Sequence, residues 1–99
     1  MCGATAGGVS AEGIDVATEA VIQGVVSRAG EPLGGAYVRL LDPSGEFTAE
    51  VPTSEAGQFR FFAAPGTWTL RTLAPGATVD RQVVAQNGLV AQVDVAVPA

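Results

Sequence analysis

Cys2 is the side chain with the most chemistry to offer in this 99-residue sequence, and it is the only cysteine. Methionine aminopeptidases remove Met1 when a small residue such as cysteine follows, so we expect the mature chain to begin with Cys2. The α-ammonium group beside the thiol would then lower the thiol pKa and favour the reactive thiolate. Such a thiolate can accept sulfur as a persulfide, or bind a soft metal ion together with ligands from a partner. An incidental thiol without a role is the alternative interpretation.

The remaining composition argues against several other kinds of site. The chain has no histidine, so it lacks the usual general base for serine chemistry. One cysteine without histidine cannot form a structural zinc site, and the acidic residues do not have the spacing of a calcium loop. We therefore expect no metal ion, no cofactor and no catalytic residues in the folded domain. The sequence predicts a protein that is not an enzyme.

Charge restricts the partners and the location that we expect. Ten acidic residues against five arginines give a net charge of −5. A nucleic-acid-binding protein needs a basic surface, and anionic membranes attract basic segments, so we expect neither partner. No apolar run reaches the roughly 18–20 residues of a membrane span. No secretory signal is recognisable, and a single cysteine suits the reducing cytoplasm, where we expect the protein.

The chain divides into two segments by composition. Residues 1–18 are rich in Gly, Ala, Ser and Thr, which predicts a flexible N-terminal tail. In residues 19–99, short apolar segments alternate with turn residues at intervals of about ten residues. This spacing predicts an all-β, seven-stranded antiparallel β-sandwich of Greek-key type. The predicted strands are 20–28, 36–42, 46–51, 58–63, 67–73, 78–86 and 89–97.

Alternation within these segments assigns their apolar residues to a core between two sheets. Residues 42–45 (DPSG) predict a type I turn, and Asn87-Gly88 predicts a β-hairpin because both residues tolerate positive φ. We expect Trp68 to be a core residue whose indole N–H needs a hydrogen-bond acceptor. The predicted core residues are Ile22, Val38, Leu40, Phe59, Phe61, Trp68, Leu70, Val93 and Val95.

The outward positions of the same strands carry arginines and aromatic residues, which are enriched at protein interfaces. We predict that a face of this kind binds a partner protein or a second copy of the chain. An ordinary solvated face, with arginine stems covering apolar surface, is the alternative. Phe62 breaks the alternation, so it either covers the end of the sandwich or is exposed for contact. The outward residues are Tyr37, Arg39, Leu41, Arg60, Phe62 and Arg71.

Two stretches of the chain resemble the carboxypeptidase-regulatory, prealbumin-like domain. The first comprises residues 21–26 (VIQGVV) and 30–40 (GEPLGGAYVRL), and the second comprises residues 56–61 (AGQFRF) and 65–70 (PGTWTL). They match the pattern I-x-G-x-V, G-x-P-L-x-G-A-x-V-x-L, G-x-F-x-F and G-x-aromatic-x-L. The resemblance implies a prealbumin (transthyretin)-like sandwich, and it says little about function because such folds have many roles.

A second resemblance, to the small SseC proteins of actinobacteria, covers nearly the whole chain. It rests on Met1-Cys2 and on residues 38–42 (VRLLD), 46–51 (EFTAEV), 57–66 (GQFRFFAAPG) and 68–71 (WTLR). This family is otherwise a domain of unknown function, and its members are often encoded beside a rhodanese-type thiosulfate sulfurtransferase. The resemblance therefore implies a link to sulfur metabolism and a sulfurtransferase as partner. The α/β pattern and the loop cysteine of a rhodanese are not visible in this chain.

Together these observations predict a non-catalytic accessory protein of sulfur transfer, with the sandwich binding a thiosulfate sulfurtransferase and Cys2 accepting sulfur. Two alternatives stay open. In the first, the chain is a structural or oligomerisation module without sulfur chemistry. In the second, it binds a small ligand or a carbohydrate. The last alternative requires an exposed aromatic platform, for which only Tyr37, Phe47 and Phe62 are available.

Overall fold

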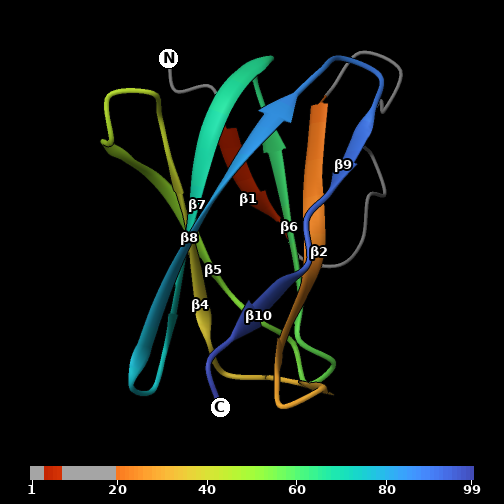
Figure 1. Ribbon diagram of the computed structural model, residues 1–99. Coiled ribbons are helices and arrows are strands. Elements are labelled where there is room, and N and C mark those ends of the chain that lie inside the picture. The colour runs from red at the N-terminus through yellow and green to blue at the C-terminus, as the bar shows by residue number, and fades with distance from the viewer. Residues whose placement is uncertain (1–3, 8–19) are drawn as a thin grey trace.

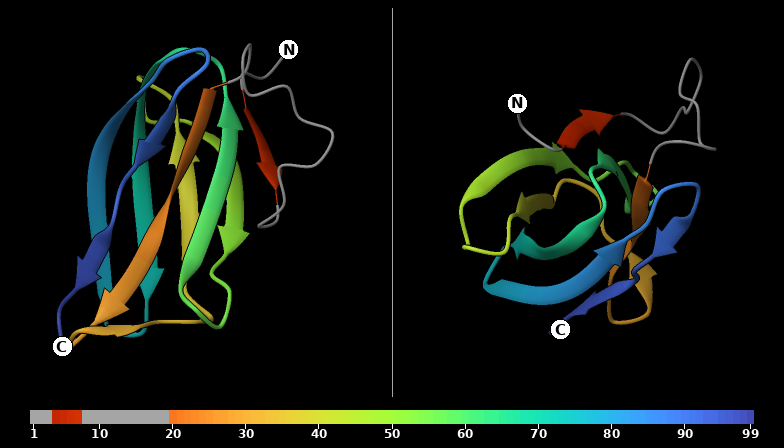
Figure 2. Two further views of the ribbon diagram at one scale, coloured as in Figure 1. Left: turned by 90° about the vertical axis from the view of Figure 1, so that its right-hand side faces the viewer. Right: turned by 90° about the horizontal axis from the view of Figure 1, so that it is seen from above.

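The described part of the chain is built from β-strands, which form two sheets packed face to face (Figure 1). The computed structural model describes residues 4–7 and 20–99. Two further views show the two sheets enclosing one core between them (Figure 2). None of these residues forms a helix with the length and apolar character that crossing a membrane would require. The prediction of an all-β sandwich is confirmed for the described residues, whereas the predicted number of seven strands is wrong, since these residues form ten.

The first sheet is centred on β2 (Ala20–Arg28), one side of which pairs with β6 (Gln58–Ala63). The far side of β6 pairs with β1 (Ala4–Gly7), and both of these pairings are antiparallel. The two-residue strand β3 (Glu31–Pro32) forms a short hairpin with the end of β2. The β-branched residues of β2 suit this central position because they pack well on a pleated surface.

The C-terminal strands β9 (Val90–Gln92) and β10 (Val95–Val97) lie along the other side of β2 and run parallel to it. The sequence predicted one continuous antiparallel strand here and a hairpin at Asn87-Gly88, and both predictions are wrong. The turn carries the chain from the second sheet across to the first. The carbonyl oxygen of Leu89 then accepts a hydrogen bond from Val21 N–H at 3.1 Å, which starts the parallel pairing.

The second sheet contains four strands, all antiparallel as predicted. Its central strands are β4 (Tyr37–Leu41) and β7 (Gly66–Ala74), and its edge strands are β5 (Phe47–Pro52) and β8 (Ala77–Ala85). The chain therefore passes repeatedly between the sheets, and strands that follow one another in sequence often belong to different layers.

Strand β1 lies inside segment 1–18, for which the sequence predicted a tail and no strand. Ala4 is paired with Ala63 and Gly7 with Arg60. The four residues of β1 are ATAG, and such small residues carry little of the apolar alternation from which strands are predicted. The other residues of that segment lie outside the described residues, and its predicted flexibility stays a prediction.

The core contains the apolar residues that alternation assigned to it. Eight of the nine predicted residues are buried, and Val93 is partly buried against them. The indole N–H of Trp68 donates a hydrogen bond of 2.9 Å to the carbonyl oxygen of Ala64, so the one polar group of this buried side chain is satisfied. The prediction for Trp68 is therefore confirmed.

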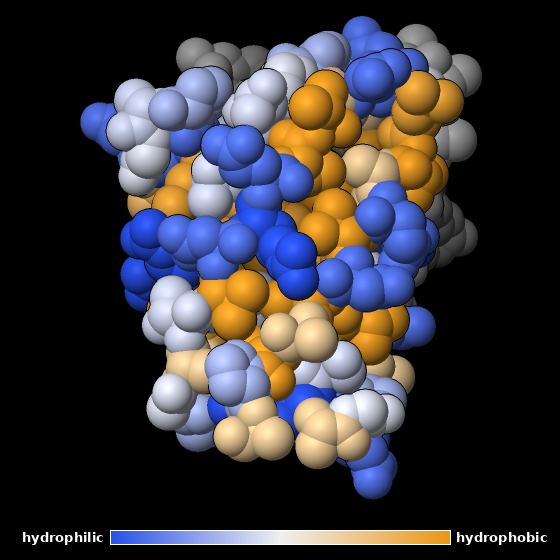
Figure 3. All heavy atoms as spheres, viewed as in Figure 1, coloured by the Kyte–Doolittle hydropathy of each residue, from blue (hydrophilic) through white to orange (hydrophobic). Residues whose placement is uncertain are grey.

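Exposed apolar side chains gather at the connection between β8 and β9. Val84, Leu89 and Val90 are each more than half exposed there. Figure 3 shows apolar surface beside this connection at its upper right. The exposure of Leu89 follows from its position at the turn between the sheets.

The predicted turn at residues 42–45 is held by a hydrogen bond of 2.8 Å from Gly45 N–H to the Asp42 carbonyl oxygen. The Asp42 carboxylate also accepts the Ser44 hydroxyl at 2.6 Å and the backbone N–H groups of Ser44 and Glu46. These bonds, the Ser44 hydroxyl foremost, hold the pKa of Asp42 below its ordinary value. The turn between β4 and β5 is thus stabilised by its own side chain.

Two buried threonines have opposite surroundings. The Thr53 hydroxyl accepts a hydrogen bond from Ala36 N–H at 3.0 Å and donates one to the Leu33 carbonyl oxygen at 2.8 Å. It therefore fixes the turn that leads into β4. The Thr72 hydroxyl on β7 is fully buried and has no hydrogen-bond partner among the described residues. A buried hydroxyl in this state destabilises the fold, because it has lost water without compensation.

Replacing Thr72 by Val should therefore stabilise the protein, because Val has nearly the same shape and no hydroxyl. We expect the free energy of unfolding, measured by urea denaturation, to rise by about 1 kcal/mol. The matched substitution Thr53→Val should lower it by roughly 1–2 kcal/mol, because the Ala36 N–H and the Leu33 carbonyl lose their partner. A loss of stability in Thr72→Val would contradict this account of the core.

Candidate functional site

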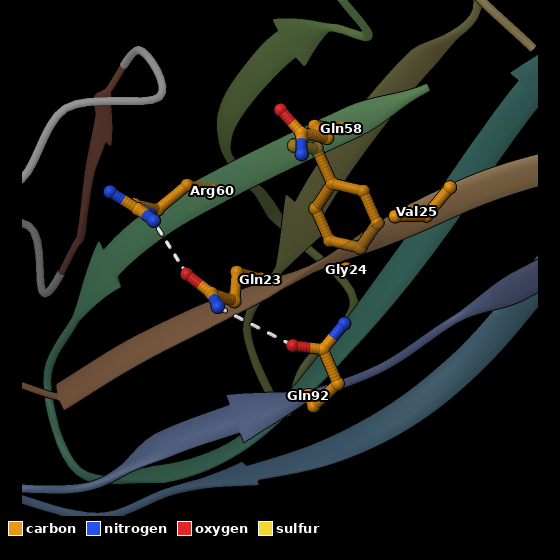
Figure 4. Close-up of a pocket in the computed structure, with 7 residues that line it drawn as sticks. Gln23, Gly24, Val25, Gln58, Arg60 and Gln92 are labelled. Carbon is orange, nitrogen blue, oxygen red and sulfur yellow. Dashed lines mark hydrogen bonds between the residues drawn. The ribbon is translucent and has the colours of Figure 1, made fainter. Parts of the chain in front are cut away.

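A polar cleft of about 280 Å³ lies on the first sheet, where β2, β6 and β9 meet. Figure 4 shows the side chains of Gln23, Arg60 and Gln92 pointing toward one another across it. Since Gln23 is paired with Arg60 on one side and with Gln92 on the other, the strand register places these side chains in one row. The residues that line the cleft are Gln23, Gly24, Val25, Gln58, Phe59, Arg60 and Gln92.

Hydrogen bonds connect this row from β6 to the C-terminal strands. Arg60 Nε donates to Gln23 Oε1 at 2.9 Å, and Gln23 Nε2 donates to Gln92 Oε1 at 3.4 Å. Gln92 Nε2 in turn donates to Asp94 Oδ1 at 2.9 Å, and the same oxygen accepts Val25 N–H at 3.1 Å. The Asp94 carboxylate thereby bonds a β2 amide at the break between β9 and β10.

Gly24 is required for the cleft because the chain passes directly over it. A Cβ atom at this position would overlap the carbonyl oxygen of Val93 and touch the ring of Phe59. Val93 N–H also bonds the Gln23 carbonyl oxygen at 2.8 Å, which keeps the two segments in contact. The glycine of the I-x-G-x-V pattern therefore serves a close backbone approach.

The cleft offers hydrogen-bonding groups and no evident acid–base pair. Three of its polar side chains are neutral amides, which do not transfer protons near neutral pH. In the described ranges, no three side chains of the His, Cys, Asp or Glu type gather where they could hold a metal ion. The arrangement is suited to orienting a polar group by hydrogen bonds.

A row of charged side chains crosses the outer face of the second sheet. Strand register places Arg39 beside Glu50 on β5 and beside Arg71 on β7, and Arg71 beside Asp80 on β8. Arg39 Nε lies 2.8 Å from Glu50 Oε2. Arg71 binds both oxygens of Asp80, through Nε at 3.0 Å and a terminal nitrogen at 3.1 Å. The order of charges across the sheet is negative, positive, positive, negative.

Two exposed aromatic side chains flank this charged row. Tyr37 lies two residues before Arg39 on β4 and is 49% exposed. Phe47 at the start of β5 is 61% exposed, and the Arg39 guanidinium carbon lies 5.9 Å from the centre of its ring. A cation over an aromatic face at this distance is attracted to it. The face thus combines apolar and charged groups.

The predicted site residues do not form one surface. Tyr37, Arg39 and Arg71 lie together on the second sheet, whereas Arg60 and Phe62 belong to β6 of the first sheet. Phe62 is buried at 8% exposure, so the alternative in which it is exposed for contact is wrong. An aromatic platform that includes Phe62 is excluded for the same reason.

Leu41 was predicted to point outward, yet it is buried at 5% exposure. It lies where the β4–β5 register shifts, although its pairing with β7 is regular. Cys2 lies outside the described residues.

Sequence reasoning missed several members of both sites. Glu50 and Asp80 were not assigned to the partner face, because only the strand register shows that they face Arg39 and Arg71. Gln23 and Gln92 were missed for a related reason, since they are far apart in sequence and meet through the unpredicted parallel pairing. The only indication that the sequence offered for these residues was their outward position in the alternation of the predicted strands.

The family model for DUF1416, described as a protein of unknown function, matches residues 2–97. The chain belongs to the DUF1416 family. An uncharacterized protein of Mycolicibacterium smegmatis is 51% identical over 86 residues, which are 86% of this chain and 96% of that protein. The uncharacterized protein Rv0814c of Mycobacterium tuberculosis is 52% identical over 83 residues, which are 83% of each chain. Membership of an actinobacterial family of unknown function is thereby confirmed, and the SseC and carboxypeptidase-regulatory assignments stay predictions.

Solved structures share the fold of this DUF1416 chain at low sequence identity. The minor pilin GBS52 of Streptococcus agalactiae superposes with a TM-score of 0.69 at 12% identity, over 84% of this chain and 45% of the pilin. Chlorocatechol 1,2-dioxygenase of Pseudomonas putida gives 0.61 at 14% identity, over the whole of this chain and 72% of the dioxygenase. The chain spans less than half of the pilin. These likenesses show the sandwich fold alone, and the prealbumin type and Greek-key arrangement stay predictions.

The ion pair between Arg71 and Asp80 leads to a test by titration. Hydrogen bonds from Arg71, aided by its charge, hold the pKa of Asp80 below the ordinary aspartate value. A lowered pKa means that the pair stabilises the fold above that ordinary value, and that the stabilisation is lost as pH falls through the lowered one. Replacing Arg71 by Gln should raise the Asp80 pKa in an NMR titration, whereas Arg81→Gln should leave it unchanged. Equal effects of both substitutions would show that the contact is not specific.

Proposed function

We propose that this DUF1416 chain is a non-catalytic binding module whose docking surface is the outer face of the second sheet. The observation that carries the proposal is the exposed combination of Tyr37 and Phe47 with the paired arginines Arg39 and Arg71. Aromatic residues and arginine contribute most to binding at protein interfaces. Strands also position these side chains more rigidly than loops would, which lowers the entropy lost on binding.

The partner that we propose is a rhodanese-type thiosulfate sulfurtransferase in the cytoplasm. The resemblance to the SseC proteins supports this choice, because members of that family are often encoded beside such an enzyme. In this scheme the sandwich docks and Cys2 carries sulfur. The Cys2 thiolate attacks the outer sulfur of the enzyme's persulfide, a new S–S bond forms on Cys2, and the enzyme's cysteine leaves as a thiolate. The exchange balances without a further oxidant or reductant.

A second candidate function is self-association as a structural module without sulfur chemistry. The exposed apolar residues Val84, Leu89 and Val90 favour it, because contiguous apolar surface commonly marks a contact site. This patch surrounds the β8–β9 connection and is separate from the charged row on the second sheet. The two candidate functions therefore depend on different residues and can be tested separately.

The docking proposal predicts that the full chain binds the purified rhodanese-type thiosulfate sulfurtransferase of its own organism. A Tyr37→Ser, Phe47→Ser double variant should raise the dissociation constant, measured by calorimetry, by tenfold or more. The reason is that two exposed aromatic anchors are removed. Leu89→Ser serves as the matched control, since it removes a similarly exposed apolar side chain in the turn between the two sheets and should bind normally. Absence of a complex with the unsubstituted chain would refute the proposed partner.

The sulfur-acceptor role predicts a mass change on Cys2. After incubation with the sulfurtransferase and thiosulfate, mass spectrometry should find the chain heavier by one sulfur atom, and the addition should disappear on treatment with a reductant. Cys2→Ser should bind the enzyme normally and gain no sulfur, because docking and transfer use different parts of the chain. If the unsubstituted chain gains no sulfur, Cys2 is not the acceptor.

A further inference from the structure

Two arginines face each other at the centre of the second sheet's outer face. Arg39 on β4 is paired in register with Arg71 on β7, so their Cβ atoms point to the same side of neighbouring strands. Like charges that are directly opposite across two strands destabilise a sheet. The carboxylates that would relieve this repulsion lie outside the pair, on the edge strands, and not between the arginines. Each arginine is thus ion-paired on its outer side only, with no carboxylate of the described residues placed between the two, and local conflicts of this kind are expected at functional positions.

Both arginines keep donors for a further acceptor. Arg39 uses Nε for Glu50, and Arg71 uses Nε and one terminal nitrogen for Asp80. A guanidinium has five N–H donors, so each side chain retains several that bind no other residue of the described chain. Each arginine side chain is 43% exposed, which leaves these donors accessible from solvent.

The order of charges across the outer face of the second sheet determines which partner surface is complementary to it. A second copy packed face to face would bring the same positive centre against this one, so the row disfavours self-association through this face. A partner that presents a carboxylate at the centre is complementary to it. Because the chain has a net charge of −5, this positive centre stands out against an acidic molecule. Charge complementarity of this type determines which partner is accepted.

We propose that Arg39 and Arg71 together bind one carboxylate side chain of the protein partner, an inference that rests on the docking function proposed above and specifies its chemistry. The carboxylate lies between the two guanidiniums and accepts a hydrogen bond from each. Apolar side chains on either side of it contact Tyr37 and Phe47, which flank the arginines along the sheet. The occupant is thus a protein segment with an exposed Asp or Glu between apolar residues.

The test is an NMR titration of the ¹⁵N-labelled full chain with a synthetic peptide that has one Glu between apolar residues. Its matched control is the same peptide with Gln in place of Glu. We expect the Glu peptide to shift the side-chain Nε–Hε signals of Arg39 and Arg71, and added salt to weaken the binding. Arg71→Gln should weaken it by about tenfold or more, as expected for loss of a charged hydrogen bond. Arg81→Gln should bind normally.

Three results would overturn the inference. They are the absence of shifts at these arginines through the millimolar range, equal shifts with the Gln peptide, and an equal loss in Arg71→Gln and Arg81→Gln. Thermal unfolding of the Arg71→Gln variant checks that it is folded. We expect only a small change in stability, because loss of the exposed ion pair with Asp80 is offset by relief of the repulsion from Arg39. The titration involves no sulfurtransferase. Selective shifts with the Glu peptide, combined with no sulfurtransferase complex, would support the carboxylate site and refute only the proposed enzyme partner. A sulfurtransferase complex without selective shifts would refute only the carboxylate site.

Discussion

The contact between the Val93 carbonyl and the bare backbone of Gly24 determines how the first sheet is completed. The C-terminal segment can approach β2 this closely only because Gly24 has no side chain. It pairs with the same side of β2 twice, before this contact as β9 and after it as β10. The same contact places Gln92 beside Gln23 and Asp94 beside Gln92, which completes the polar row of the cleft. The absence of a Cβ atom at Gly24 is thus required for the parallel pairing at the edge of the first sheet and for the polar cleft.

Much of the sandwich follows from local sequence patterns. Alternation places Phe61, Leu40 and Leu70 in the core because a strand turns successive side chains to opposite faces. Turn residues mark the ends of most strands, and the Asp42 turn forms as its side chain suggests. Local patterns fail at Asn87-Gly88, because the dipeptide specifies a reversal of the backbone and not the sheet in which the next strand pairs.

The sites were less accessible to sequence reasoning than the core was. Alternation predicts that Arg60 and Arg71 both point outward. It does not predict that they belong to different sheets and therefore lie on opposite faces of the molecule. Membership of a sheet depends on crossings between layers, which are long-range contacts. The pairing of Arg39 with Arg71 likewise requires the register of β4 against β7, which no single strand encodes. Sequence therefore identified candidate side chains, and only the assembled sheets show which of them act together.

The division of the last strand has a consequence for the behaviour of the protein at high concentration. An uninterrupted edge strand exposes a row of amide and carbonyl groups on which strands of other molecules can add. Here the edge beyond β2 consists of two three-residue strands, interrupted at Val93 and bearing the Asp94 carboxylate. The edge strand β8 of the other sheet carries Asp80 and Arg81 at its middle. These two edges are therefore poor templates for the addition of strands from other molecules.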